Sequence, residues 1–314
     1  MNLTTPVHIP ANSLRISHRQ HILLMGSCFA DEMGRKLQDD RFDCLVNPFG
    51  TLYNPLSIVQ ALERLLCGEE FRESDLFQHG GLWHSWMHHG SFSGVNRRET
   101  LDSINASFLK AVDYLRHTDV LVITWGTNRS YFYDSQLVAN CHKVPEKRFE
   151  TVDYSMDAIV TRMTDVLNRL WQVNPQLQVV LTVSPIRYVK YGLHESQLSK
   201  ATLLLAADAL QRQHPQQVHY FPAYEILMDE LRDYRFYAED MVHPSPLAVQ
   251  YIYERFTACF VDGEEQQISA ECRKLVREMN HRPLHPESEE YRQFRARLEK
   301  KINDLKQQYP YLKI

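Results

Sequence analysis

Short apolar runs alternate along this chain with longer segments in which apolar residues recur at helical spacing. Such an alternation predicts strands joined by helices, and therefore right-handed βαβ crossovers and a mostly parallel sheet covered on both faces. The predicted strands span residues 21–25, 43–47, 119–125, 177–183 and 218–222. The expected fold is a three-layer α/β/α sandwich around a mostly parallel, five-stranded sheet.

Two helices are well marked by their start, stop and packing signals. In the first, Asn54 is the expected N-cap, Pro55 takes the first helical position, and Gly68 follows the last residue. In the second, apolar residues recur at helical spacing from Met156 to Leu170. This stripe predicts a helix face that packs on the sheet.

Two segments depart from the alternation. Residues 131–150 predict a hairpin excursion, with Asp134 and Ser135 in its turn, rather than a helix. From about residue 263 the chain is charged and helical in pattern. We therefore expect a main domain over 1–262 and a C-terminal helical extension over 263–314, packed outside the sheet.

Composition narrows the class of protein. The chain is 44% hydrophobic and 24% charged, which is typical of a globular protein, and its net charge of -4 gives no basic surface for nucleic acid. No stretch approaches the roughly 20 apolar residues of a membrane span, and the N-terminus lacks the apolar core of a secretion signal. The six cysteines show no C-x-x-C spacing, so reduced thiols are expected. We expect a cytoplasmic protein with no metal, cofactor, nucleic acid or membrane partner.

Three polar clusters follow predicted strands, at 26–28, 126–128 and 184–185. Ligands of parallel sheets bind outside the carboxyl ends of the strands, near the point where the strand order reverses. In the first cluster Cys28 stands where a helix begins, and the free N–H groups and partial positive charge of a helix start favour a thiolate and an oxyanion. A lowered pKa is therefore expected for this thiol. The alternative is a small residue with a purely structural role.

A second set of residues supplies the partners that such a nucleophile needs. Asp240 and His243 lie three residues apart on a loop after the last strand, a spacing that lets the carboxylate orient the imidazole toward a nucleophile. Asn128 is a suitable side-chain donor to an oxyanion, with a turn asparagine as the alternative. Gly50, which lacks a Cβ, is a second candidate because its backbone N–H can approach a substrate oxygen. An ordinary loop glycine is the alternative there.

In chain order these residues match the Ser, Gly, Asn and His blocks of the SGNH/GDSL hydrolases. The pentapeptide GSCFA, with NPFGTLYNPLSI, ITWGTNRSYFY, VSPIR and LRDYRFYAEDMVHPS, closely resembles the bacterial GSCFA family, placed in that superfamily. The resemblance covers about residues 20–260 and implies a flavodoxin-like fold of the SGNH-hydrolase type. Aligned on Gly26, the superfamily's serine falls on Cys28 and its aspartate on Ser27, so Cys28 is the expected nucleophile and Ser27 the alternative one.

The resemblance implies an acyl-ester hydrolase that works through Cys28, His243 and Asp240. The N–H groups of Cys28 and Gly50 and the side chain of Asn128 would hold the oxyanion, and an acylated carbohydrate is one expected substrate. Two alternatives stay open. One is an acyltransferase to a sugar hydroxyl, because sugar acetyltransferase-like proteins of similar fold carry a Gly-Asn-Cys motif. The other is an inactive SGNH fold that binds a glycan or a protein partner.

Further residues are weaker candidates for substrate contacts. The segment 81–94 is rich in aromatic residues and histidines, and Trp83, His84 and His89 suggest a substrate-facing loop. Plain packing, or a metal site formed by its histidines, are the alternatives. Arg187 follows the fourth strand, where it is suited to an anionic substrate group or to an ordinary surface position.

Overall fold

The computed structural model describes residues 4–281 and 283–313. Its central sheet has five parallel strands in the order β10-β9-β5-β1-β2. These strands are β1 (His21–Gly26), β2 (Asp43–Val46), β5 (Val120–Trp125), β9 (Gln178–Val183) and β10 (Val218–Phe221). Each lies within one residue of its predicted bounds. Counted along the chain, the order is that of flavodoxin-like sheets, with the reversal between β1 and β5.

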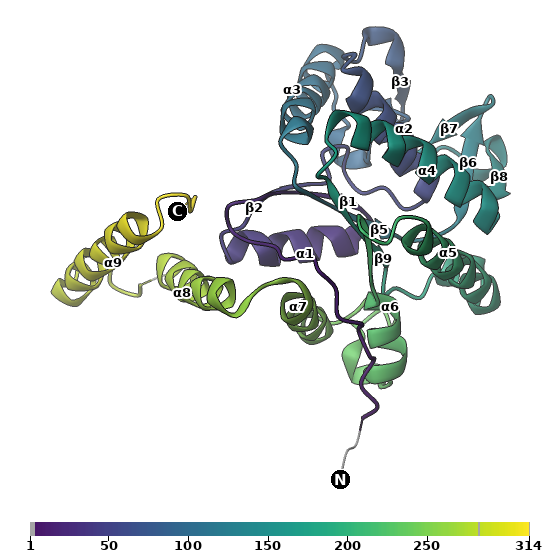
Figure 1. Cartoon of the computed structure of the whole chain (residues 1–314). Coiled ribbons are helices and arrows are strands. Elements are labelled where there is room, and N and C mark those ends of the chain that lie inside the picture. Colours follow the sequence, from purple (N-terminus) through teal and green to yellow (C-terminus); the bar gives the residue numbers. More distant parts are fainter. Residues whose placement is uncertain (1–3, 282, 314) are drawn as a thin grey trace.

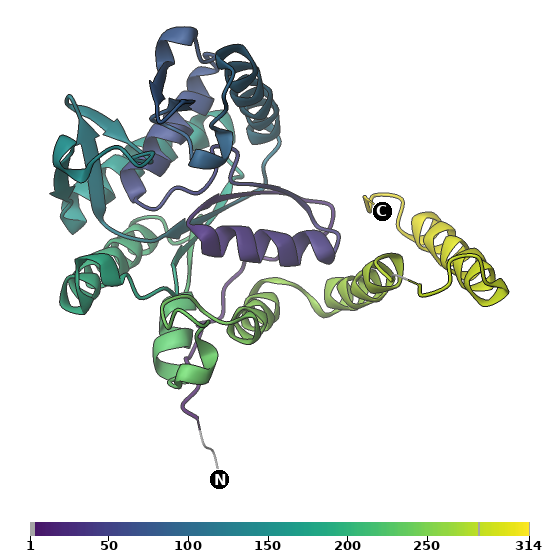
Figure 2. The ribbon, with the colours of Figure 1, turned by 180° about the vertical axis from the view of Figure 1, so that it is seen from behind.

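Helices cover both faces of this sheet, which confirms the three-layer α/β/α prediction (Figures 1 and 2). Side chains of a strand point alternately to the two faces, so Leu23 and Met25 join one core cluster while Ile22 and Leu24 join the other. The first face carries α2 (Pro55–Cys67), α3 (Arg97–Arg116), α4 (Met156–Val173) and α5 (Leu193–Gln213). The second carries α1 (Cys28–Asp39), α6 (Ala223–Glu225) and α7 (Pro246–Phe260).

The start and stop signals predicted for α2 and the buried face predicted for α4 are both present in the structure. The side chain of Asn54 accepts a hydrogen bond from the Ser57 N–H at 2.8 Å, Pro55 begins α2, and Gly68 ends it in a left-handed conformation. The stripe from Ile159 to Leu170 is buried against the sheet.

Two small antiparallel sheets lie beside the central one. The first pairs β3 (Leu76–His79) with β4 (Leu82–Ser85). The second contains β6 (Arg129–Tyr133), β7 (Gln136–Val138) and β8 (Glu150–Asp153). Its β6–β7 hairpin turns at Asp134 and Ser135, whose φ angles of 47° and 63° are those of a two-residue hairpin turn. The hairpin expected within residues 131–150 is thus formed by β6 and β7, and β8 pairs with β6 on its other side.

The C-terminal segment forms two helices, α8 (Gly263–Met279) and α9 (Glu289–Gln308), that extend away from the sheet (Figures 1 and 2). They share a small apolar cluster of their own. Arg273 of α8 donates to the buried Asp40 at 2.7 Å and attaches this pair of helices to the main body. The division of the chain into domains at residue 262 stays a prediction. Among the described residues, no helix combines the length and apolar character needed to cross a membrane.

Candidate active site

Cys28 is the first residue of α1, directly after the turn that leaves β1. The turn needs glycine at position 26, because φ there is 147° and a Cβ would overlap the carbonyl oxygen of Thr124 on β5. The close approach of these two strands brings Cys28 to the carboxyl end of β1, beside the reversal of strand order. This is the position at which flavodoxin-like folds bind ligands.

Ser27 serves as the cap of α1 rather than as an exposed hydroxyl. Only 1% of the residue is accessible to solvent, and its Oγ accepts a hydrogen bond from the Phe29 N–H at 3.3 Å. The same Oγ donates to Ser184 Oγ at 3.0 Å, at the end of β9. Ser27 therefore fixes the start of the helix, and Cys28 is the neighbour whose side chain lines a pocket.

The expected lowering of the Cys28 pKa is wrong. Burial raises the pKa of this thiol above its ordinary value of 9.0, and the negative charge of Asp31 one turn along α1 raises it further. The backbone N–H groups of Phe29 and Cys28 oppose this effect but do not overcome it. The helix start is therefore the weaker influence, and the resting thiol holds its proton at neutral pH.

The Asp240–His243 pair forms as the spacing predicts. Asp240 Oδ2 lies 2.6 Å from His243 Nδ1, and Oδ1 accepts backbone N–H groups of Val242 and His243 at 2.9 Å each. The backbone and side-chain hydrogen bonds from His243, followed by that from Val242, lower the Asp240 pKa to about 2. A carboxylate facing Nδ1 assigns the proton to that nitrogen, so Nε2 is the nitrogen able to accept one.

The loop that carries this pair is held by its own hydrogen bonds. The Ala238 N–H donates to His243 O at 2.8 Å, and the Ser245 N–H donates to Phe236 O at 2.8 Å. Met241 turns the tip of the loop with a φ of 57°. The side chains of Asp240 and His243 are 49% and 46% exposed, so the pair lies at the protein surface rather than within the core.

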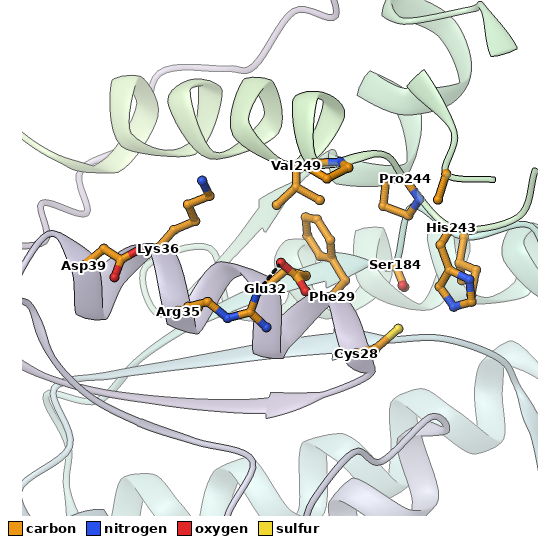
Figure 3. A pocket seen from close by; sticks show the side chains of 13 residues that line it. Cys28, Phe29, Glu32, Arg35, Lys36, Asp39, Ser184, His243, Pro244 and Val249 are labelled. Atoms are coloured by element: carbon orange, nitrogen blue, oxygen red, sulfur yellow. Dashed lines mark hydrogen bonds and ion pairs between the residues drawn. The ribbon is translucent and has the colours of Figure 1, made fainter. Parts of the chain in front are cut away.

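Cys28 and His243 line the same pocket, a cavity of about 480 Å³ between α1 and α7 (Figure 3). Both residues belong to the described part of the chain, and they are not hydrogen-bonded to each other. A proton can pass between them only when the exposed loop moves His243 closer or a water molecule joins them.

The two other expected oxyanion donors are engaged elsewhere. The Gly50 N–H donates to Asn47 O at 2.7 Å within a tight turn, in which the glycine has a φ of 74°. The Asn128 amide donates to Tyr154 O at 2.9 Å, and Asn128 lines a separate cavity next to α5. The Cys28 N–H at the start of α1 stays the best-placed donor, and the oxyanion roles of Gly50 and Asn128 stay predictions.

The aromatic segment 81–94 contributes mostly to packing. His84 is buried, with Ser93 Oγ at 2.6 Å from its Nδ1 and His79 O at 3.0 Å from its Nε2. Trp83 is covered by the guanidinium of Arg97, 4.9 Å from the ring centre. These contacts are packing contacts, and a substrate-facing role for Trp83 and His84 stays a prediction.

His89 lies closer to the site. Its backbone N–H donates to Phe49 O at 2.9 Å, and Gly50 packs directly against its Cβ. Its imidazole is near enough to Asp31 to oppose the rise in the pKa of that carboxyl, a rise caused by burial. A substrate contact through His89 stays a prediction.

Arg187 supports the loop of the Asp240–His243 pair. Its guanidinium lies 5.9 Å from the ring centre of Tyr234 and 5.7 Å from that of Tyr237. Its backbone N–H donates to Val242 O at 3.1 Å, next to His243. These contacts of Arg187 support the loop. A bond between Arg187 and an anionic substrate group stays a prediction.

Lys200 is the residue that sequence reasoning missed. It lies on α5 and is only 1% exposed, and its Nζ donates to Gly126 O at 2.8 Å and to Ser184 O at 2.9 Å. Burial lowers the pKa of Lys200 to about 7, and the negative charge that Cys28 carries as a thiolate opposes this lowering. The ammonium group therefore joins the ends of β5 and β9 just behind the candidate nucleophile.

Within residues 4–281 and 283–313, no three His, Cys, Asp or Glu side chains are grouped to hold a metal ion.

The fold and the site together define an α/β protein with a cysteine after the first strand of its central sheet and a His–Asp pair on the loop before α7. The model of the GSCFA family matches residues 21–256, and that of the GSCFA domain protein, C-terminal domain, matches residues 272–314. This chain belongs to the GSCFA family. No curated protein matches it.

Among solved structures the similarities are distant. A candidate platelet activating factor from Streptococcus pneumonia is 10% identical, with 76% of this chain and 83% of that chain covered and a TM-score of 0.40. A carbohydrate esterase family 3 protein from Talaromyces cellulolyticus is 11% identical, with 80% and 99% covered and a TM-score of 0.34. An acetyl xylan esterase from the rumen bacterium Butyrivibrio proteoclasticus is 12% identical, with 79% and 64% covered and a TM-score of 0.36. Similarities this low do not establish what this chain acts on.

Proposed function

We propose that this protein is an acyl-ester hydrolase in which Cys28 is the nucleophile, His243 the general base and Asp240 the residue that orients the base. One observation carries the proposal. Cys28 and His243, more than two hundred residues apart in the chain, line one pocket at the carboxyl end of the sheet, and Asp240 is hydrogen-bonded to His243. A nucleophile, a base and an orienting carboxylate are the three members of a catalytic triad for covalent acyl transfer.

The first half of the reaction forms an acyl-enzyme. His243 Nε2 takes the Cys28 proton as Sγ bonds to the ester carbonyl carbon, and the negative charge of the tetrahedral intermediate falls beside the Cys28 N–H. The C–O bond of the ester then breaks, and the alcohol leaves with the proton from His243. Asp240 stabilises the imidazolium between these two steps.

The second half releases the acid. His243 takes a proton from a water molecule, the hydroxide bonds to the thioester carbon, and the C–S bond breaks, after which Cys28 regains its proton. The need for a base follows from the raised pKa of the thiol, because little thiolate exists before His243 acts. An acylated carbohydrate as the substrate and a cytoplasmic location stay predictions.

Hydrolysis of p-nitrophenyl butanoate by the full chain tests the proposal. We expect Cys28→Ala and His243→Ala each to lower kcat/KM by about 10²-fold or more. Cys67→Ala, which removes an exposed cysteine at the end of α2, is the matched control and keeps the wild-type rate. Full activity in Cys28→Ala would contradict the proposal. Product formation only when a sugar alcohol is added, with the acyl group found on the sugar, would replace hydrolysis by acyl transfer.

A further inference from the structure

The pocket beside Cys28 continues as a groove along α1. Most of its lining surface is apolar, and the apolar residues that line it are Phe29, Ile186, Ala238, Pro244, Pro246 and Val249. Phe29 and Val249 are almost fully buried, so the two helices α1 and α7 hold them in place. Cys28 and His243 lie at one end, and Lys36 and Asp39 lie at the other (Figure 3).

The charged residues of the groove do not provide a free charge at its floor. Glu32, Arg35 and Lys36 line the α1 side of the groove, where Arg35 pairs with Glu32 at 3.1 Å and Lys36 Nζ donates to Gln250 Oε1 on α7 at 2.7 Å. Asp39 is exposed at the far end. The charged side chains on α1 are thus mostly paired or exposed to solvent, and most of the lining surface of the groove is apolar, which disfavours a polar occupant such as a sugar ring.

The length of the groove limits the occupant. Eight residues of helix separate Cys28 from Lys36, which corresponds to about 12 Å at 1.5 Å per residue. An unbranched chain of about six to eight carbons, which advances ~1.25 Å per bond in a zigzag, extends about 6–9 Å and so fills more than half of this length. An acetyl group would leave most of the apolar surface in contact with water.

We infer that the groove between α1 and α7 binds the acyl chain of the substrate, so that the preferred substrates are esters of medium-length, unbranched carboxylic acids. The inference rests on the proposed function, because it takes the carbonyl carbon to lie at Cys28 Sγ. Cys28 lines one end of the groove, so the acyl chain of an ester whose carbonyl lies at Sγ extends into it. For this reason we assign the groove to the acyl chain and not to an unrelated apolar ligand. Each buried CH₂ group then raises kcat/KM by up to about fourfold.

The first test compares p-nitrophenyl acetate, butanoate, hexanoate and octanoate. For the wild-type chain we expect kcat/KM to rise from acetate to hexanoate. Val249→Trp, which fills the middle of the groove, is expected to lower the ratio of hexanoate to acetate hydrolysis by about tenfold. Leu247→Trp is the matched control on the same helix, because Leu247 is exposed outside the groove, and it keeps the wild-type ratio. Preference for acetate, with the same ratio in all three proteins, would overturn the inference.

The second test does not depend on turnover. Free hexanoate and acetate are compared as protectants of Cys28 against iodoacetamide, measured on the Cys28 peptide by mass spectrometry, with exposed Cys67 as the internal reference. We expect hexanoate to slow labelling of Cys28 severalfold at concentrations at which acetate has no effect, and Val249→Trp to abolish this protection. Protection without hydrolysis of any ester would retain the groove and overturn the proposed function. No protection by hexanoate, even where esters are hydrolysed, would overturn the groove.

Discussion

The two halves of the candidate site are built on very different supports. Cys28 follows a strand that lies between two parallel neighbours, and its helix is capped by the buried Ser27. His243 belongs to a surface loop that is held mainly by its own hydrogen bonds. The nucleophile is thus fixed in position by the sheet, whereas the base is fixed in orientation by Asp240 but not in its distance from Cys28.

Because the two halves are supported differently, substitutions in each half should affect stability and activity differently. Substitutions around Cys28 disturb the packed ends of the strands, so they should lower stability together with activity. Substitutions around His243 disturb an exposed loop, so they should lower activity and leave stability nearly unchanged. The following predictions test this contrast, from the largest expected effect to the smallest.

Gly26→Ala should be the most damaging change to the nucleophile half. A Cβ at this position meets the Thr124 carbonyl, and the φ of 147° is unfavourable for any residue with a side chain. We expect a loss of about 4 kcal/mol or more in the free energy of unfolding, measured with urea. Gly263→Ala at the start of α8, where a Cβ meets open space, is the control with little change. Near wild-type stability of Gly26→Ala would show that β1 and β5 are less tightly constrained.

Asp240→Asn tests the base half. The amide keeps the size of the side chain but removes the charge that orients His243 and stabilises its imidazolium, so we expect kcat/KM to fall by about 10²-fold. The melting temperature should change by about 1 °C or less, because the pair is exposed. A large drop in melting temperature would contradict the contrast between the halves.

Lys200→Met tests the support behind Cys28 through its pH dependence. Burial lowers the pKa of Lys200 from its ordinary value of 10.5 to about 7, so between these pH values the unfolded chain binds a proton that the folded chain does not. The contribution of Lys200 to the free energy of unfolding is therefore lowest below about pH 7 and rises as the pH increases above that value. From pH 6 to pH 9 we expect the free energy of unfolding of the wild type to rise by about 2–3 kcal/mol relative to Lys200→Met.

Lys110→Met on the exposed side of α3 is the control for this experiment, since it removes a lysine that is already in solvent. Its stability should follow the wild type at every pH. Parallel curves for the wild type and Lys200→Met would mean that Lys200 titrates like an exposed lysine, and that its ammonium has no special role behind Cys28.

Arg97→Met should have the smallest effect. It removes the cation above Trp83 and a surface ion pair with Glu73 at 2.8 Å, which together are worth about 1 kcal/mol or less. Ester hydrolysis should stay within twofold of the wild type, as measured by kcat/KM. A clear change in KM would instead support a substrate contact by Trp83.

Much of the fold could be predicted because its signals are local. The five strands are continuous apolar runs, and Asn54, Pro55 and Gly68 act on the backbone within one turn of helix. The Asp240–His243 pair was equally predictable, because both its members lie on one short loop.

The rest depends on contacts between distant segments. The positions of Gly50 and Asn128 in the sequence match those of oxyanion donors. In the structure their N–H groups donate to Asn47 and Tyr154, and the spacing of residues in the sequence does not predict these partners. The pKa of Cys28 was misjudged because burial outweighs the local effect of the helix start.

Lys200 did leave a signal in the sequence. It stands at helical spacing from the apolar residues Leu203 and Ala207, on the buried face of α5, where a charged residue is unusual. A lysine on an apolar stripe indicates a buried hydrogen-bonding partner, although the sequence does not name that partner. The structure supplies it in the two carbonyl groups at the ends of β5 and β9.

The central claim, that Cys28 is a nucleophile activated by His243, is tested most directly by trapping the acyl-enzyme. The full chain is mixed with p-nitrophenyl hexanoate, quenched in acid within one turnover and analysed by peptide mass spectrometry. We predict a hexanoyl group on Cys28 in the wild type and its loss in His243→Ala, with Cys67 unmodified in both proteins. A hexanoyl group on Ser27, or equal acylation of Cys28 with and without His243, would contradict the account.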